Sequence, residues 1–125
     1  MPQIDPDKLT PQQRAICIEG GTEPPFSSPL VHEKRNGTYH CVACNTPLFS
    51  STAKFDSGSG WPSFFQPLSD QVLSEQLDLS HGMRRVEVRC AACGSHLGHV
   101  FTDGPPPTGL RYCINGTALV FMPKP

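Results

Sequence analysis

Six cysteines are the residues of this sequence best suited to chemistry, and four of them form two CxxC pairs. Cys41 pairs with Cys44 and Cys90 with Cys93, and each pair follows a segment that we expect to be a strand. A CxxC turn directs both sulfurs at one centre, and two such turns supply the four thiolates of a tetrahedral zinc site. Because four thiolates leave no position open for water, a single Zn2+ bound there is expected to be structural.

Other chemistries compete for the same four thiols. Residues 45–89 separate the pairs, which exceeds the usual spacing of a zinc ribbon, so the pairs are expected to join distant parts of one domain. An iron–sulfur cluster or a single iron ion also accepts four cysteine ligands. A redox role fits less well, because neither pair opens a helix in a βαβ unit as a thioredoxin-like motif does. The sequence therefore favours zinc.

The two remaining cysteines are Cys17 and Cys113. Alternation along a strand places Cys113 on the same face as Arg111 and Asn115. A neighbouring cation lowers the pKa of a thiol and increases the fraction of thiolate, which is the nucleophilic form. The alternative is an inert buried thiol, since free cysteine is among the most buried residue types.

An acid and an apolar wall could accompany this thiol. Two histidines lie on the strand expected after the second CxxC pair, where His99 shares a face with Phe101 and His96 points the other way. A histidine on an apolar face is usually a packed core residue, but a Cys–His pair is a recurring catalytic unit. The single tryptophan, Trp61, lies in the Gly/Ser/Pro-rich loop 56–62, where it either packs in the core or forms one wall of an apolar pocket.

The elements that must position these residues are predicted to be mainly antiparallel β, with a helical N-terminus. Thr10 as N-cap, Pro11 at the first position and Gln13 in the capping box predict a helix that runs to about residue 18. Residues 70–79 fit a short helix or an irregular strand equally well. Strands are predicted at 38–41, 47–49, 83–89, 97–101, 110–115 and 117–122.

Length and charge exclude several classes of protein. With 125 residues the chain fits one domain over 9–125, preceded by a flexible arm over 1–8. A net charge of −1 gives no basic surface for nucleic acid or for an anionic membrane. The N-terminal segment lacks the apolar core of a secretory signal, and no apolar run is long enough to span a bilayer. We therefore expect a cytoplasmic protein, in whose reducing setting cysteines are metal ligands or reactive thiols.

Taken together, the sequence resembles the B-type methionine sulfoxide reductases (SelR-like domain), the family that reduces the R epimer of methionine sulfoxide in proteins. The resemblance extends from about residue 7 to residue 122, and it depends on the combination of motifs rather than on any single one. The matching segments are 21–26 (GTEPPF), 54–64 (KFDSGSGWPSF), 80–83 (SHGM), 96–101 (HLGHVF) and 111–115 (RYCIN), together with both CxxC pairs, Asp103-Gly104 and Pro107-Thr108-Gly109.

The resemblance implies two antiparallel β-sheets with short N-terminal helices and one structural Zn2+. It implies that Cys113 attacks the sulfoxide sulfur, that His99 assists protonation of the oxygen, and that Asn115 belongs to the same catalytic group. Residues implied to form or support the substrate site are Trp61, Phe101, His96, Arg111 and Asp103. Residues implied to bind zinc are Cys41, Cys44, Cys90 and Cys93.

One position departs from the family pattern. Ser59 occupies the position at which many members carry the cysteine that resolves the oxidised nucleophile, and a serine cannot form that disulfide. Cys17 is the replacement that the sequence offers, with a thioredoxin-type dithiol reducing the resulting disulfide. The expected partners are thus oxidised proteins as substrates and a thioredoxin-type reductant. The protein itself is expected to be a monomer.

Two other functions remain open at this point. A non-enzymatic zinc adaptor shares paired CxxC turns, but it needs no additional thiol flanked by a cation, a histidine and a tryptophan. A thiol peroxidase would use Cys113 in a similar way, but it does not explain a pocket suited to a methyl group.

Overall fold

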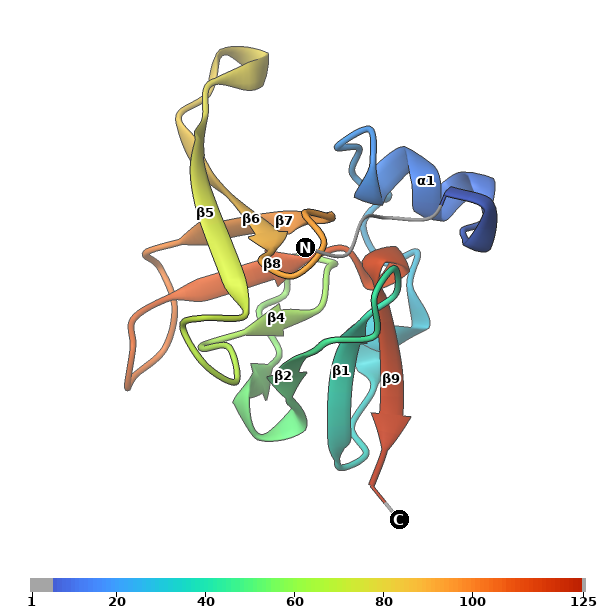
Figure 1. The fold of residues 1–125 in the computed structure, drawn as a ribbon. Helices are drawn as coiled ribbons and strands as arrows, with labels where there is room; N and C mark the ends of the chain where they lie inside the picture. Colours follow the sequence, from blue (N-terminus) through green and yellow to red (C-terminus); the bar gives the residue numbers. More distant parts are fainter. Residues whose placement is uncertain (1–5, 125) are drawn as a thin grey trace.

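The computed structural model describes residues 6–124, which form two antiparallel β-sheets with short helices around them (Figure 1). The three-stranded sheet has the order β2-β1-β9, and the six-stranded sheet has the order β3-β4-β8-β7-β6-β5. The strands are β1 (Gly37–Cys41), β2 (Pro47–Ser50), β3 (Lys54–Phe55), β4 (Ser63–Phe64), β5 (Leu73–Asp78), β6 (Arg85–Cys90), β7 (His96–Phe101), β8 (Arg111–Ile114) and β9 (Leu119–Pro123). The predicted fold class is confirmed.

The helix α1 (Pro11–Cys17) begins as the sequence predicts. The Thr10 side chain accepts a hydrogen bond from the backbone N–H of Gln13, and the Gln13 side chain accepts one from the backbone N–H of Thr10, which completes the capping box. The buried residues of α1 face β7 and η5 (Gly116–Ala118). The remaining 3-10 helices are η1 (Pro6–Lys8), η2 (Pro29–His32), η3 (Ser51–Ala53) and η4 (Ser80–Gly82).

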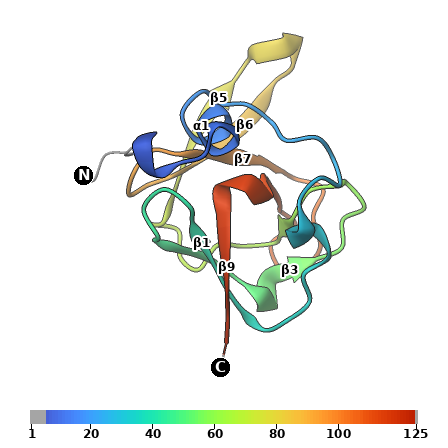
Figure 2. The same ribbon diagram turned by 90° about the vertical axis from the view of Figure 1, so that its right-hand side faces the viewer.

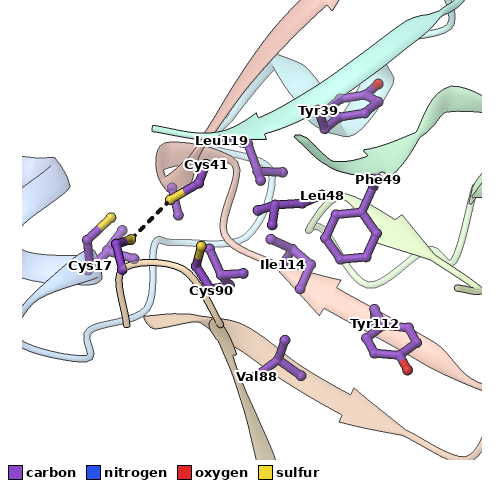
Figure 3. Packing of buried hydrophobic residues seen from close by; sticks show 14 of the residues in the cluster. Cys17, Tyr39, Cys41, Leu48, Phe49, Val88, Cys90, Tyr112, Ile114 and Leu119 are labelled. Carbon is purple, nitrogen blue, oxygen red and sulfur yellow. Dashed lines mark hydrogen bonds between the residues drawn. The ribbon is translucent and has the colours of Figure 1, made fainter. Parts of the chain in front are cut away.

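Aromatic side chains join the two sheets in the core. Tyr39 of β1 and Phe49 of β2 both pack on Phe64 of β4, with ring centroids 5.0 and 4.3 Å apart respectively. All three side chains are fully buried, and each buried aromatic ring contributes about 1.5–3 kcal/mol to stability. Figure 3 shows Tyr39, Phe49 and Tyr112 at one end of this core and three cysteines at the other.

Four segments differ from the sequence predictions or refine them. Residues 70–79, for which helix and strand were both open, contain the strand β5, which pairs with β6 along its whole length. The two-residue strands β3 and β4 were not predicted, because they are too short to show alternation. Part of the predicted flexible arm, residues 6–8, forms the helix η1, and residues 1–5 lie outside the described residues.

The hairpin of β5 and β6 extends away from the rest of the molecule, and both views show this (Figures 1 and 2). Strand β5 is the outer strand of the six-stranded sheet, and β6 separates it from β7. Between residues 6 and 124 no helix has the length and apolar character that crossing a membrane requires.

Candidate active site and four-cysteine cluster

The candidate nucleophile and acid face each other on neighbouring strands. Cys113 of β8 lies opposite His99 of β7 in the register, and Glu87 of β6 lies opposite His99 on the other side. Strand β4 pairs with the free side of β8 and places Ser63 opposite Cys113. Directly paired residues share one face of a sheet, so the register gathers these groups on a single face.

A pocket of about 90 Å³ opens on this face. This volume is well below that of pockets for drug-sized molecules, and it suits the end of a side chain. Its walls combine apolar rings with a thiol, an imidazole and an amide. The lining residues are Thr22, Trp61, Arg85, Gly98, His99, Phe101, Cys113 and Asn115.

Gly98 sets how closely β7 and β8 can approach. A Cβ atom at this position would collide with the backbone carbonyl of Cys113, which leaves no room for a side chain. Since the obstacle is backbone, it could yield only by moving β8. The close packing of β7 on β8 thus explains why position 98 is a glycine, which the residue pattern alone does not reveal.

Cys113 is partly exposed and does not belong to the group formed by the four CxxC thiols. Burial raises the pKa of the Cys113 thiol above its ordinary value, while hydrogen bonding from Ser59 and the charge of Arg111 act in the opposite direction. The expected lowering by Arg111 is therefore present, but the prediction of a net lowered pKa is wrong because desolvation outweighs it.

Ser59 lies next to Cys113, the candidate nucleophile. Its Oγ lies 3.8 Å from the Cys113 Sγ, within the range of a hydrogen bond to sulfur. Its hydroxyl also contacts that of Ser57 at 2.8 Å, and Ser57 in turn contacts Ser63 at 2.7 Å. A connected row of three hydroxyls therefore ends at the Cys113 sulfur.

The loop before β1 holds the Trp61 side chain in place. Its indole Nε1 donates a hydrogen bond to the backbone carbonyl of Glu23 at 2.9 Å. The Glu23 backbone N–H donates to the Asn115 side-chain oxygen, and the Asn115 amide donates to the Leu97 carbonyl. Asn115 thus connects β7, β8 and the loop around residue 23, which fixes the wall that carries Trp61.

Arg111 and Asp103 form an ion pair at the edge of the site. The guanidinium donates to both carboxylate oxygens, at 2.9 and 3.2 Å, and lies 4.4 Å from the ring centroid of Phe101. The Arg111 hydrogen bond lowers the pKa of Asp103. Neither residue of the pair lines the pocket itself, so both act from behind Phe101 and Cys113.

The two histidines each pair with a carboxylate from the β5–β6 hairpin. His99 Nε2 lies 2.8 Å from the Asp78 Oδ2, and His96 Nδ1 lies 2.6 Å from the Glu87 Oε2. Burial lowers the pKa of His96, partly opposed by Glu87. His96 is buried and lies outside the pocket lining.

The structure brings together most of the predicted site. Trp61, Phe101, His99, Cys113 and Asn115 line one pocket, whereas His96, Arg111 and Asp103 lie around it. Sequence reasoning missed Thr22, Glu23, Asp78, Arg85 and Glu87. Alternation along the strand predicted at 83–89 could have placed Arg85 and Glu87 on one face, but nothing in the sequence places Asp78 beside His99.

The four CxxC sulfurs converge as predicted. All lie within 4.8 Å of one another, and Cys41–Cys93 and Cys44–Cys90 are each 3.6 Å apart. Zinc–sulfur bonds of about 2.3 Å in a tetrahedron require sulfur separations of about 3.8 Å, so the cluster is the right size for such an ion. The four cysteines form a group that can hold a metal.

The two CxxC turns have matching hydrogen bonds. The backbone N–H of Asn45 donates to the Cys41 carbonyl, and that of Gly94 donates to the Cys90 carbonyl. Asn45 and Gly94 both have positive φ, at 64° and 81°. Two separate segments thus adopt one turn geometry, which is what a shared metal centre requires.

Cys17 lies at the inner end of α1 and is 2% exposed. Burial raises the pKa of its thiol to about 12, and the nearby Cys41 and Cys93 contribute. Figure 3 shows Cys17 beside Cys41 rather than near the strand that carries Cys113. In this conformation Cys17 adjoins the cluster and not the pocket.

A model of the SelR domain matches residues 9–123 of this chain. That match covers more than half of the chain, so the chain belongs to the SelR-domain family, which confirms the family predicted from the motifs. The family is one of oxidoreductase enzymes, the peptide methionine sulfoxide reductases of the MsrB type.

Curated relatives agree with this assignment. The chain is 59% identical over 116 residues to the peptide methionine sulfoxide reductase MsrB of Pseudomonas putida (strain W619), covering 93% of this chain and 87% of the relative. It is 56% identical over 117 residues to the MsrB of Agrobacterium fabrum, covering 94% and 87%. It is 60% identical over 114 residues to the MsrB of Teredinibacter turnerae, covering 91% and 84%.

Proposed function

We propose that this protein reduces methionine-R-sulfoxide in oxidised proteins to methionine, with Cys113 as the nucleophile, in a single domain over residues 9–125. The observation that carries the proposal is the partly exposed Cys113 opposite His99 in a pocket walled by Trp61 and Phe101. A thiol outside the four-cysteine cluster is free for chemistry. The apolar rings suit an S-methyl group, and an imidazole beside the thiol suits an oxygen that must be protonated.

In the first step the Cys113 sulfur attacks the sulfoxide sulfur. An S–S bond to the substrate forms as His99 gives a proton to the sulfoxide oxygen and takes up the proton of the Cys113 thiol. The S–O bond and the new S–S bond then break, and the oxygen moves as a hydroxyl group to the Cys113 sulfur. Methionine leaves with its lone pair restored, and Cys113 remains as a sulfenic acid. The net change transfers one oxygen atom, so the substrate is reduced by two electrons and the thiol is oxidised by two.

The enzyme returns to its starting state by thiol chemistry. The Cys17 thiol attacks the Cys113 sulfenic acid, a disulfide forms, and the oxygen leaves as water. A thioredoxin-type dithiol then reduces the disulfide by exchange. Because Cys17 is buried beside the cluster, this step requires α1 to move toward the pocket.

The four-cysteine cluster binds one Zn2+ in a structural role under this proposal. The support is the donor set of four sulfurs, their separations and the matched turns. The cluster joins β1 of one sheet to β6 of the other, and no chemical step passes through it. We further propose that the protein acts in the cytoplasm as a monomer.

The test of this function uses dabsylated methionine-R-sulfoxide and methionine-S-sulfoxide with dithiothreitol as reductant. The wild-type protein should convert the R epimer and leave the S epimer, and Cys113→Ser should convert neither. Conversion of the S epimer, or unchanged conversion by Cys113→Ser, would contradict the proposal. Absence of activity with the metal bound would favour a zinc adaptor instead.

A further inference from the structure

Two carboxylates of the β5–β6 hairpin each contact one histidine of β7. They do so at different ring nitrogens. Asp78 contacts Nε2 of His99 at 2.8 Å, whereas Glu87 contacts Nδ1 of His96 at 2.6 Å. The two rings are 5.6 Å apart and nearly perpendicular. The free nitrogen therefore differs between them: it is Nδ1 in His99 and Nε2 in His96.

The free nitrogens also differ in their surroundings. Nε2 of His96 is buried without a hydrogen-bond partner among the described residues. Nδ1 of His99 makes no hydrogen bond to any residue of the described part of the chain, but it is not among the buried unpartnered atoms. Since His99 lines the pocket that contains Cys113, its Nδ1 is the nitrogen left to meet a substrate.

Asp78 can act only as an acceptor toward His99. Hydrogen bonding from Ser80, followed by that from His99, holds the pKa of Asp78 well below its usual range. An ionised carboxylate has no proton to donate, so Nε2 of His99 must carry the hydrogen. When His99 is charged, its second proton resides on Nδ1.

Asp78 is itself held in place by its neighbours. Its Oδ1 accepts a hydrogen bond from the backbone N–H of Ser80 at 2.9 Å, and Arg85 lies 3.5 Å from its Oδ2. The Oδ2 that contacts His99 is thereby fixed in direction.

The other charged groups around His99 have contacts of their own. Glu87 lies opposite His99 in the register, but its carboxylate is engaged by His96 and by Arg89. Cys113 faces His99 from β8, and burial raises the pKa of its thiol. Asp78 is thus the only carboxylate of the described residues in direct contact with the His99 ring.

We propose that Asp78 is a positioning residue for the reaction: it fixes His99 with Nε2–H toward β5, so that Nδ1 faces the pocket and delivers the proton to the substrate oxygen. This inference rests on the proposed role of His99 as the acid. Asp78 touches neither substrate nor Cys113 in this arrangement. It acts through the tautomer and orientation of His99.

A purely structural role is the competing explanation, because Asp78 also closes the turn into η4 through Ser80. Asp78→Asn separates the two roles. An asparagine oxygen can still accept from Ser80, but its NH2 group then faces Nε2 of His99. Nε2 must become an acceptor, and the neutral ring carries its hydrogen on Nδ1 instead. In other enzymes such a reversal leaves the geometry intact and impairs proton transfer severely.

The experiment compares the wild type, Asp78→Asn and Glu75→Gln, which removes a charge from an exposed position of the same strand. Each is assayed with a peptide containing methionine-R-sulfoxide and with dithiothreitol. Asp78→Asn should lower kcat by about 100-fold, the scale of a general acid, with KM changed by less than about threefold. Glu75→Gln should match the wild type.

Nitrogen-15 NMR of the histidine rings gives the readout that a structural role would not change. Neutral His99 should carry its proton on Nε2 in the wild type and on Nδ1 in Asp78→Asn, while His96 should stay as it is. In a His99→Gln background, Asp78→Asn should cause no further loss of kcat, because both changes remove the same function.

Three results would overturn the inference: a kcat of Asp78→Asn equal to that of Glu75→Gln, a fall in kcat with the His99 tautomer unchanged, or wild-type His99 protonated on Nδ1 when neutral. The last measurement needs no variant, so it decides the matter even if Asp78→Asn does not fold. Full activity of His99→Gln would instead refute the role of His99 in the proposed function.

Discussion

The four-cysteine cluster and the Cys113 pocket use the same atom type in opposite ways. In the cluster, a tight turn of a few residues positions each pair of sulfurs, and the two turns contain equivalent backbone hydrogen bonds. In the pocket, a single sulfur is surrounded by groups from distant segments, including Ser59 and His99, as well as by Arg111 of its own strand. Each CxxC turn is therefore locally determined, whereas the surroundings of Cys113 depend on the whole fold.

This difference predicts separate consequences for stability and for chemistry. Removing a cluster sulfur should damage the fold first, because the cluster joins β1 to β6 across the two sheets. Removing the pocket sulfur should abolish the reaction and leave the fold intact. Variants at the two sites can test this separation directly.

The largest effect is expected at the cluster. Cys90→Ser, or treatment with a strong zinc chelator, should lower the free energy of unfolding by about 5 kcal/mol or more, since binding of a structural zinc contributes directly to folding. Thermal unfolding and metal analysis would measure this. A variant that loses its metal but unfolds at the wild-type temperature would show that the cluster is not structural.

A large effect on activity without an effect on stability is expected at the pocket. Cys113→Ser should reduce turnover of methionine-R-sulfoxide by at least about 1,000-fold, because serine is a far weaker nucleophile at neutral pH. Its melting temperature and bound metal should equal those of the wild type. A Cys113→Ser protein with reduced metal content would contradict the separation of the two sites.

Recycling gives the next test, because it asks whether Cys17, which lies beside the cluster, reacts with Cys113 of the pocket. Cys17→Ser should keep the first turnover and lose multiple turnovers with thioredoxin, which coupled oxidation of NADPH can follow. Adding Ser59→Cys should restore recycling, since position 59 lies within 3.8 Å of the Cys113 sulfur. Normal cycling by Cys17→Ser would mean that thioredoxin or another thiol reduces Cys113 directly.

The smallest effect is a shift in the pH profile of Arg111→Met. Arg111 opposes the raised pKa that burial gives Cys113, so its removal should raise this pKa further. The thiolate fraction at neutral pH should then fall, and the rate of the first step with it. The rates of variant and wild type should converge at high pH, and a constant ratio at all pH values would exclude this explanation.

The sequence predicted the features that depend on neighbouring residues. The capping box of Thr10 and Gln13, the two CxxC turns and the longer strands all follow from local patterns, and the structure has them. The alternation around Cys113 also placed Arg111 on the correct face. These features need only local geometry.

The features that the sequence did not predict depend on packing between segments that lie far apart along the chain. The strand β5 has a mixed pattern because it is an outer strand with most side chains exposed, and only its pairing with β6 identifies it. Asp78 meets His99 across that pairing, and no spacing along the chain reveals it. The net pKa of Cys113 was mispredicted for the same reason, since desolvation depends on the surrounding fold.

The absence of a side chain at position 98 has a consequence for substrate range. The main chains of β7 and β8 are in direct contact here, so this side of the pocket has little room to change for different substrates of the proposed reaction. Variation among protein substrates must then be absorbed on the opposite wall, where Trp61 lies in a loop of glycines and serines. Under the proposed function, a rigid pair of strands on one side and a loop residue on the other would let this pocket accept the same oxidised side chain in many sequence contexts.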